Sequence, residues 1–487
     1  MKPVRAIALR FNGPVDNQAI ANAMANVPFA FCANVSIHRF RYPNLSDENQ
    51  PWFSSGDIRQ GVYAGVDHAA LRPLDEEIIE RMRDCEATFM YMMIRQECSR
   101  NIPYMERKQR YLRHLRFWND FLERHAINLL LSSSLPHEMP DHIVYALCKL
   151  KGIPTVFNHA TLLKDTQFLQ EDIEESASQI GKRYAELTAE GKADVALCPQ
   201  FEQYYAEQTQ PEGKTTIIFP EQPQNVLRRF FRKVLAKPAV LLHWIPSLFY
   251  LTDWIRRLQK MQNAWRHARL LGFYDRCAVD PDFTKQYVYF PLQYQPECST
   301  CPMAGAFVDQ EIAAQLLSHT VPEGVLIYVK EHPRQRKEGI VGRNIAFFRE
   351  LAAMPNVRLI KHEANTFKLR EHSRAVATGT GTAGMEAIFR GKPVLLFGHT
   401  YYQYAPAVFQ IRTRGDCEHA MEAIFKRGEK PEPLGVRRFL KAMEDTRVHG
   451  SLTDWYAYNL SDMTVEESRQ AFTKAFTEKL QKMFGNP

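Results

Sequence analysis

The second half of the chain alternates short apolar runs with stretches in which apolar residues recur at helical spacing. Short apolar runs bounded by turn residues are typical of buried strands, and their alternation with helices predicts a parallel, doubly wound sheet. The expected strands are 287–292, 325–330, 357–360, 375–378 and 394–397, and the expected helices are 309–317, 347–353, 366–373, 385–390, 436–445 and 465–483.

The first half shows the same alternation less regularly. Its clearest unit is an apolar run at 127–131, a serine-rich loop, a helical stretch at 140–151 and a second apolar run at 153–157. This order predicts a βαβ unit with parallel strands. Helix-rich sequence at 171–208 follows, so a second α/β domain is expected before residue 210.

Between the two halves lies a segment that is both basic and aromatic. The window 226–270 holds ten Lys and Arg residues against one acid, Asp253, whereas the whole chain carries a net charge of only +7. The basicity is therefore local and indicates a partner for this segment. We consider two interpretations, a helical hairpin with solvated charges and an element lying on the anionic inner leaflet of a membrane. A nucleic-acid partner is not expected, because no nucleic-acid motif surrounds the patch.

Length and composition limit the alternatives. A chain of 487 residues is too long for one hydrophobic core, and 45% hydrophobic with 24% charged residues is ordinary for a globular protein. No run of about 18 uncharged apolar residues suggests a membrane span, and the first ten residues lack the apolar core of a signal peptide, so a cytoplasmic location is expected. Nine scattered cysteines indicate no disulfide framework, and the lone C-x-x-C pair, Cys298 and Cys301, lacks the further ligands of a zinc site.

These patterns predict four segments. They are an N-terminal Rossmann-like domain at 1–210, a linker with a basic helical insertion at 211–284, a C-terminal Rossmann-like domain at 285–430 and terminal helices at 431–487 that pack back on the first domain.

A glycine- and threonine-rich turn joins one expected strand to the next helix. Glycines let the backbone approach a ligand, and the N–H groups at a helix N-terminus attract anions, so the turn predicts a site for a diphosphate or a nucleoside monophosphate. A plain strand–helix turn is the alternative. The expected ligand-binding residues are Gly379, Thr380, Gly381, Thr382, Ala383 and Gly384.

The same turn matches the dinucleotide pattern G-x-G-x-x-G. That pattern requires an acid at the end of the following strand, whereas here the strand ends in Phe397-Gly398-His399-Thr400. A nicotinamide or flavin cofactor is therefore disfavoured, and no G-K-[ST] completes a Walker A motif. Glu386, just inside the next helix, is a candidate for the ribose hydroxyls, with a helix-dipole role as the alternative.

Three further candidates follow strand ends, where ligands of open α/β sheets bind. His332, after the strand 325–330, could stabilise a leaving phosphate, with Lys330 as a second positive charge. Glu297 could act as a base or as a nucleophile at an anomeric carbon. In the first half, Glu138 follows the serine-rich loop and could face an acceptor. Structural or surface roles remain the alternatives for these residues.

Four ordered motifs are similar to those of a known family. The sequences at 290–297, 328–333, 378–386 and 391–394 resemble bacterial capsule polysaccharide biosynthesis proteins, which include β-Kdo transferases. The resemblance implies a GT-B fold, in which two Rossmann-like domains face each other across a cleft and the C-terminal domain binds the donor, usually CMP-β-Kdo.

The resemblance also implies roles for individual residues. His332 and Pro333 match the histidine–proline motif that holds the CMP portion, and residues 380–382 match the phosphate loop. Glu297 stands where the family has its catalytic carboxylate, more often an aspartate.

The resulting hypothesis is a metal-independent glycosyltransferase without a cofactor. It would move Kdo or a related ulosonic acid from CMP to a saccharide on a lipid carrier, in capsule or lipopolysaccharide biosynthesis, with 226–270 on the inner leaflet. The alternatives are a sialyltransferase or UDP-dependent transferase of GT-B fold, and a non-catalytic nucleotide-binding component of a polysaccharide assembly complex.

Overall fold

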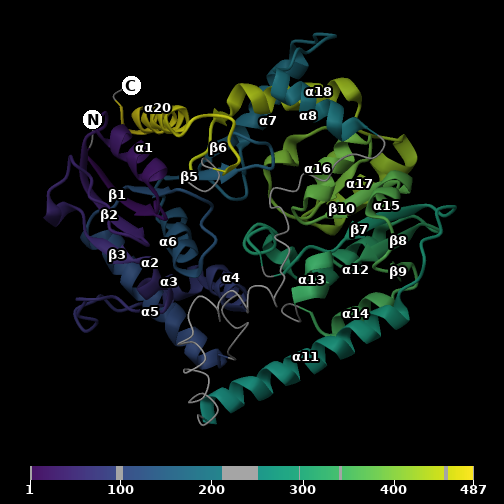
Figure 1. The fold of residues 1–487 in the computed structure, drawn as a ribbon, viewed down its shortest axis with the longest axis horizontal. Helices are drawn as coiled ribbons and strands as arrows, with labels where there is room; N and C mark the ends of the chain where they lie inside the picture. Colours follow the sequence, from purple (N-terminus) through teal and green to yellow (C-terminus); the bar gives the residue numbers. More distant parts are fainter. Residues whose placement is uncertain are drawn as a thin grey trace, which may run out of the picture.

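Two α/β sheets organise the chain, and a long helix lies below them in the view of Figure 1. In this computed structural model the structure describes residues 3–94, 102–210, 251–295, 297–338, 343–453 and 459–485. Each sheet has helices on both of its faces, so the burial of strand residues comes from two sides.

The first sheet has seven strands in the order β13-β6-β5-β4-β1-β2-β3. Strands β1 to β5 pair in parallel, and β6 and β13 add two antiparallel strands at one side. Its strands are β1 (Val4–Leu9), β2 (Phe29–Ser36), β3 (Trp52–Ser54), β4 (Leu129–Ser132), β5 (Thr155–Ala160), β6 (Thr166–Gln170) and β13 (Val448–His449). Its helices are α1 (Pro14–Met24), α2 (Ser55–Arg59), α3 (Glu76–Arg81), α4 (Arg83–Met93), α5 (Tyr104–Arg124) and α6 (Met139–Leu150).

The second sheet has six strands in the order β12-β11-β10-β7-β8-β9, and all of its pairings are parallel. Its strands are β7 (Tyr287–Pro291), β8 (Leu326–Lys330), β9 (Val357–Leu359), β10 (Ala375–Thr378), β11 (Val394–Leu396) and β12 (Val408–Gln410). Its helices are α12 (Gln310–Thr320), α13 (Pro333–Glu338), α14 (Ile345–Ala353), α15 (Thr366–His372), α16 (Thr382–Phe389) and α17 (Arg414–Glu422).

The chain crosses between the two halves more than once. Helices α7 (Ser178–Ala189) and α8 (Pro199–Thr209) fall within residues 1–210 but share a core with α16 and α18 (Pro433–Thr446) of the other half. Conversely, α20 (Val465–Phe484) returns to α1, where Phe476 packs on Phe11. Figure 1 shows α20 beside α1 near both chain ends. Two Rossmann-like sheets joined in this way form the GT-B architecture.

A single long helix covers the second part of the basic segment. Helix α11 spans Leu251–Cys277, and its C-terminal part is anchored in the second core by the buried side chains of Leu270 and Tyr274. Leu258, Met261 and Trp265 are 60%, 68% and 59% exposed. The rest of the expected hairpin, 226–250, lies outside the described residues. Among the described helices, none is long and apolar enough to cross a membrane.

Candidate functional site

Three loops meet at the carboxyl ends of neighbouring strands in the second sheet. Strand β7 pairs with β8 on one side and with β10 on the other, so the loops after these strands emerge side by side. Gln293, after β7, joins Thr380, after β10, through two hydrogen bonds. Its Nε2 donates to the Thr380 hydroxyl at 3.2 Å, and its Oε1 accepts from the Thr380 N–H at 3.1 Å. This edge contains Glu297, His332 and the whole glycine-rich loop.

The glycine-rich loop leads directly into α16. Gly381 is the N-cap residue, and no side chain caps the helix. The Gly381 N–H donates to the Thr378 hydroxyl at 3.0 Å, and the Tyr402 hydroxyl donates to the Gly381 carbonyl at 2.6 Å. The loop is thereby held by the side chains of Thr378 and Tyr402, while the positive end of α16 faces the strand-end edge.

All three glycines of the loop lie against neighbouring side chains, and a Cβ at position 381 would come within 2.8 Å of the Thr378 hydroxyl. A Cβ at position 379 would clash with the side-chain oxygen of Gln293, and one at 384 would clash with the hydroxyl of Tyr402. The expectation that these glycines also make room for an anion stays a prediction. They admit the neighbouring side chains that fix the loop.

Glu386 has a partner inside the fold. It forms an ion pair with Arg370 of α15, and the two side chains are only 12% and 5% exposed. Burial raises the pKa of Glu386, although Arg370 opposes this shift. A ribose contact by Glu386 would have to share the carboxylate with Arg370, and it stays a prediction.

Lys330 is also engaged away from the loop. Its ammonium group donates to the carbonyl of Ala364 and to the hydroxyl of Thr366 at 3.1 Å, and burial lowers its pKa. Arg334, which the sequence reasoning missed, lies closer to the candidate catalytic carboxylate. Its guanidinium is 3.2 Å from Glu297 and stacks over the ring of Tyr294 at 4.7 Å. The signal in the sequence was a basic residue directly after the histidine–proline pair.

His332 forms one hydrogen bond through its backbone and one through its ring. Its backbone N–H donates to Oε1 of Glu331 at 2.7 Å, and its Nδ1 accepts from the Arg334 N–H at 3.2 Å. A ring nitrogen that accepts from a backbone N–H carries no proton, so in the neutral ring the proton lies on Nε2. Nε2–H is thus the hydrogen-bond donor of the neutral His332 ring.

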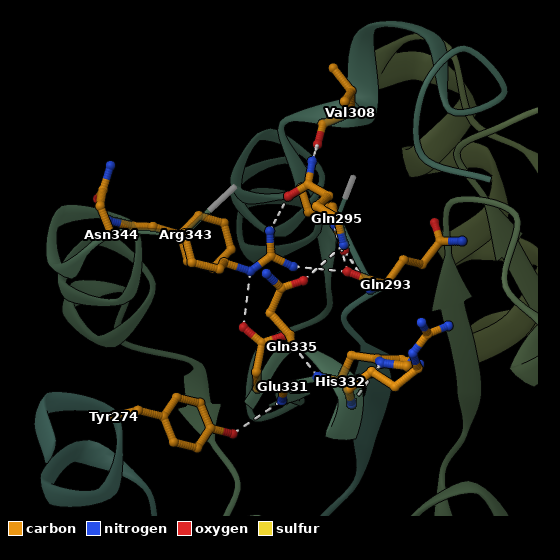
Figure 2. Close-up of polar contacts among 12 residues, drawn as sticks. Tyr274, Gln293, Gln295, Val308, Glu331, His332, Gln335, Arg343 and Asn344 are labelled. Atoms are coloured by element: carbon orange, nitrogen blue, oxygen red, sulfur yellow. Dashed lines mark hydrogen bonds and ion pairs between the residues drawn. The ribbon is translucent and has the colours of Figure 1, made fainter. Parts of the chain in front are cut away.

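A buried arginine, Arg343, forms hydrogen bonds with the loops after β7 and β8. Arg343 donates to Glu331 Oε2 at 2.9 Å, to the Gln293 carbonyl at 3.0 Å and to the side-chain oxygen of Gln295. Gln295 in turn donates its backbone N–H to Gln335 at 2.8 Å. Figure 2 shows Arg343 between these groups. The sequence did not reveal this role, because the contacts of Arg343 span tens of residues.

Glu138 belongs to a separate cluster on the first sheet. It is the N-cap residue of α6 and forms ion pairs with Arg10 at 3.7 Å and with Arg59 at 3.4 Å. Asp141, one helical turn later, lies 3.4 Å from Arg10 and is buried. Glu138 and Glu297 therefore lie on different sheets. Asp141 was missed because a polar residue in the first turn of a helix is ordinary.

The carboxyl of Asp141 gives a prediction about pH. Burial raises its pKa from 3.8 to about 6, with Arg10 opposing. Because the folded-state pKa is raised, protonated Asp141 stabilises the fold at low pH, and this stability is lost as the pH rises from about 4 through 6. We expect Asp141→Asn to lack this loss, which amounts to at most about 3 kcal/mol. Urea unfolding of both proteins at pH 4 and pH 7 measures it, with Asp47→Asn, an exposed site, as control. The prediction is contradicted if the free energies of unfolding of the wild type and of Asp141→Asn differ by the same amount at pH 4 and at pH 7.

The C-x-x-C pair shows no sign of a metal centre in the described residues. Neither Cys298 nor Cys301 is in a disulfide. Within the described ranges, no group of three or more His, Cys, Asp or Glu side chains is arranged to hold a metal ion.

The matching family covers the segment that contains this edge. Residues 249–410 match the family described as capsule polysaccharide biosynthesis protein. The match includes Glu297, His332 and the glycine-rich loop, so the resemblance seen in the motifs is confirmed. No curated protein matches the chain.

Several solved structures match the chain at low sequence identity. The UDP-GlcNAc 2-epimerase of Methanocaldococcus jannaschii is 10% identical, with 90% of this chain and 99% of that chain covered and a TM-score of 0.25. A structure of Thermosulfurimonas dismutans KpsC, beta Kdo 2,7 transferase, is 12% identical over 73% of this chain and 88% of that chain, with a TM-score of 0.30. A second KpsC structure, beta Kdo 2,4 transferase, is 14% identical over 64% and 87%, also with a TM-score of 0.30. These likenesses are too weak to bear on activity.

Proposed function

We propose that this protein is a glycosyltransferase that moves Kdo, or a related ulosonic acid, from a CMP-sugar to a saccharide acceptor in capsule or lipopolysaccharide biosynthesis. The observation that carries the proposal is the convergence of Glu297, His332 and the loop 378–384 at adjacent strand ends, within the segment that matches the capsule family.

Each group in this edge has a role in the proposal. The N-terminus of α16 binds the phosphate of the donor, and Nε2–H of His332 donates to the phosphate oxygen as negative charge develops there. Glu297 supplies the carboxylate that acts at the anomeric carbon while the bond from that carbon to the phosphate oxygen breaks. The leaving group is CMP, with both electrons of the broken bond.

We also propose that transfer needs no divalent metal. The N-terminus of α16, His332 and Arg334 together supply the positive charge that a metal ion gives to a departing phosphate in other transferases. Activity that is unchanged by EDTA supports this part of the proposal, and activity that EDTA removes and Mg²⁺ restores would overturn it.

A thermal-shift panel with CMP, UDP, GDP and NAD tests the choice of nucleotide. We expect CMP to stabilise the protein most, by about 2.7 kcal/mol at a hundred times its dissociation constant. A larger shift with UDP would favour a UDP-dependent transferase instead. A shift with NAD alone would overturn the proposal, because it would make the glycine-rich loop a dinucleotide site.

Helix α11 supports a lipid-linked acceptor at an anionic membrane. Its exposed side chains of Leu258, Met261 and Trp265 recur at helical spacing, and Arg269 stacks over Trp265 at 4.7 Å. We expect the protein to float with vesicles that contain phosphatidylglycerol, and Trp265→Glu to weaken this. Equal flotation with neutral phosphatidylcholine vesicles would speak against an electrostatic surface.

A further inference from the structure

A groove lies between helix α7 and the segment that follows β11. This segment contains the short helix η4 (Tyr401–Tyr404), which packs against both α7 and β12. The groove has a volume of about 590 Å³, within the range of roughly 300–1,000 Å³ that small-ligand sites occupy. None of its lining residues belongs to the edge formed by Glu297, His332 and the loop 378–384, so the groove is a separate feature of the molecule.

The groove is lined by a glutamine that has an unused acceptor. Gln403 is only 4% exposed, and its Nε2 donates to the backbone carbonyl of Glu174 and to the hydroxyl of Tyr404, both at 3.0 Å. Its Oε1 is also buried, and no group of the described residues donates to it. A buried acceptor without a donor is unfavourable, so Oε1 favours a ligand that supplies an O–H or N–H group.

The neighbouring tyrosine adds a donor to this acceptor. The hydroxyl oxygen of Tyr404 accepts from Gln403, and no residue in the described ranges accepts the proton of this hydroxyl. The Tyr404 O–H can therefore donate to a ligand. A donor and an acceptor on adjacent side chains match a sugar hydroxyl, which both donates and accepts.

Two tyrosine rings form the apolar part of the groove. Tyr184 of α7 and Tyr404 of η4 both line it, and both are half-buried. A Cβ at Gly181 would come within 2.6 Å of the Tyr404 ring, so the glycine allows this ring to lie close to the backbone of α7. Aromatic rings that also carry a polar group suit ligands with both C–H and O–H surfaces, as sugars have.

The charged groups of the groove disfavour most charged ligands. Its lining holds two exposed carboxylates, Glu174 and Glu175, and one exposed ammonium group, Lys182. The carboxylates would repel a phosphate or a nucleotide, and Lys182 would repel a strongly basic peptide. Ser178 and Gln410 add an uncharged hydroxyl and an uncharged amide. The lining therefore fits a neutral ligand that is rich in hydroxyl groups.

The backbone is strained on both sides of the groove. Ala177, the N-cap residue of α7, and Ala407, which directly precedes β12, have φ values of 51° and 52°. Residues other than glycine seldom adopt this left-handed conformation, which persists where the surrounding structure enforces it, often at binding sites. The Ala177 N–H donates to the Gln170 side chain at 3.1 Å, and the Ala407 carbonyl accepts from the Val394 N–H at 3.0 Å. Both sides are thus held in place by the fold itself.

We propose that this groove is an accessory saccharide site, outside the edge proposed for the donor. The Gln403 oxygen and the two carboxylates accept from sugar hydroxyls, the Tyr404 hydroxyl donates to one of them, and the tyrosine rings contact the C–H face of the sugar. A saccharide chain held here stays attached to the enzyme between transfer steps. That role rests on the proposed function, whereas the saccharide chemistry rests on the groove alone.

Saturation-transfer NMR on the full chain tests this proposal, with lactose, cellobiose and N,N′-diacetylchitobiose as probes. We expect at least one of these disaccharides to receive saturation. Glu175→Gln and Tyr404→Phe each remove one hydrogen-bonding group and should weaken its binding about 3- to 10-fold. Glu175 is exposed, and the change at Tyr404 keeps the ring, so both variants are expected to fold.

Glu186→Gln is the matched control. Glu186 also lies on α7 but outside the groove, where it pairs with Arg183 at 3.0 Å and is 62% exposed. This variant should bind the disaccharide as the wild type does. Trilysine serves as the cationic comparison. The proposal is overturned if no disaccharide receives saturation, if Glu175→Gln and Tyr404→Phe leave its binding unchanged, or if trilysine binds and Glu175→Gln removes that binding.

CMP binding, measured on the same samples, separates this proposal from the proposed function. The groove variants should retain CMP binding, because the donor edge and the groove share no lining residue. Disaccharide binding without CMP binding would support the accessory site and contradict the transferase assignment. CMP binding without disaccharide binding would support the transferase assignment and overturn the accessory site.

Discussion

Arg343→Ala is expected to lower the free energy of unfolding by about 3–5 kcal/mol, the cost of removing one partner of a buried ion pair. The side chains of Arg343 and Glu331 are only 1% and 7% exposed, so the variant leaves a carboxylate buried without its partner. It also removes the donors to the Gln293 carbonyl and to Gln295. Guanidinium unfolding, followed by fluorescence, measures the loss as a shift of the midpoint.

An ion pair near the surface supplies the control for this prediction. Arg336 binds Asp275 through two hydrogen bonds of 2.7 and 2.8 Å, but these side chains are 22% and 49% exposed. Arg336→Ala should therefore cost about 1 kcal/mol at most. The double variant Arg343→Met with Glu331→Gln removes both buried charges and should regain most of the stability. If Arg343→Ala and Arg336→Ala lower the free energy of unfolding by the same amount, the proposed role of burial is contradicted.

Glu297→Gln is expected to lower the rate of sugar transfer by about 10²- to 10⁴-fold, the range for removal of a catalytic carboxylate group. The side chain is 42% exposed and pairs with a surface arginine, so the stability should change by no more than about 0.5 kcal/mol. CMP binding should persist, because the loop 378–384 and His332 are untouched. Steady-state kinetics should place the loss in kcat, with KM for the donor little changed.

Glu371→Gln is the matched control for this variant. Glu371 pairs with Arg390 at 2.8 Å and is 48% exposed, but it lies near the C-terminal end of α15, which leads into the opposite edge of the sheet. This variant should transfer sugar at the wild-type rate. A Glu297→Gln enzyme of full activity would remove Glu297 from the mechanism.

Most strands of the second sheet could be predicted because they are covered on both faces, whereas the edge strand β12, whose residues are partly or fully exposed, was missed. Strands buried in this way are continuous apolar runs, and 325–330 and 394–397 are plain examples. Strand β6 was not predicted, although all of its residues are buried. Its sequence, Thr166–Gln170, is largely polar, yet Gln167 and Gln170 are buried because Asn158, His159 and Ser176 hydrogen-bond to them. Such side-chain hydrogen bonds leave no periodic trace in a sequence.

The candidate site likewise contains residues that could be predicted from the sequence and residues that could not. Glu297 and His332 could be proposed from position alone, because loops that follow adjacent parallel strands meet at one edge. The partners that orient them could not, since Arg343 reaches Gln293 across 50 residues and Thr380 reaches Gln293 across 87. For Lys330, position in the sequence did not reveal the partners of the side chain. Its place in the sequence suggested a phosphate contact, whereas its ammonium group donates to Ala364 and to Thr366 at the start of α15.

Release of CMP from CMP-Kdo by the purified protein, without any acceptor, tests the central claim most directly. A transferase with its donor site at the edge formed by Glu297, His332 and the loop 378–384 hydrolyses its donor slowly, with water in place of the acceptor. We predict CMP release above the spontaneous rate in the wild type, lowered at least about 100-fold in His332→Ala, which loses the group that stabilises the leaving phosphate. Release no faster than in buffer, or release that His332→Ala leaves unchanged, would contradict the account.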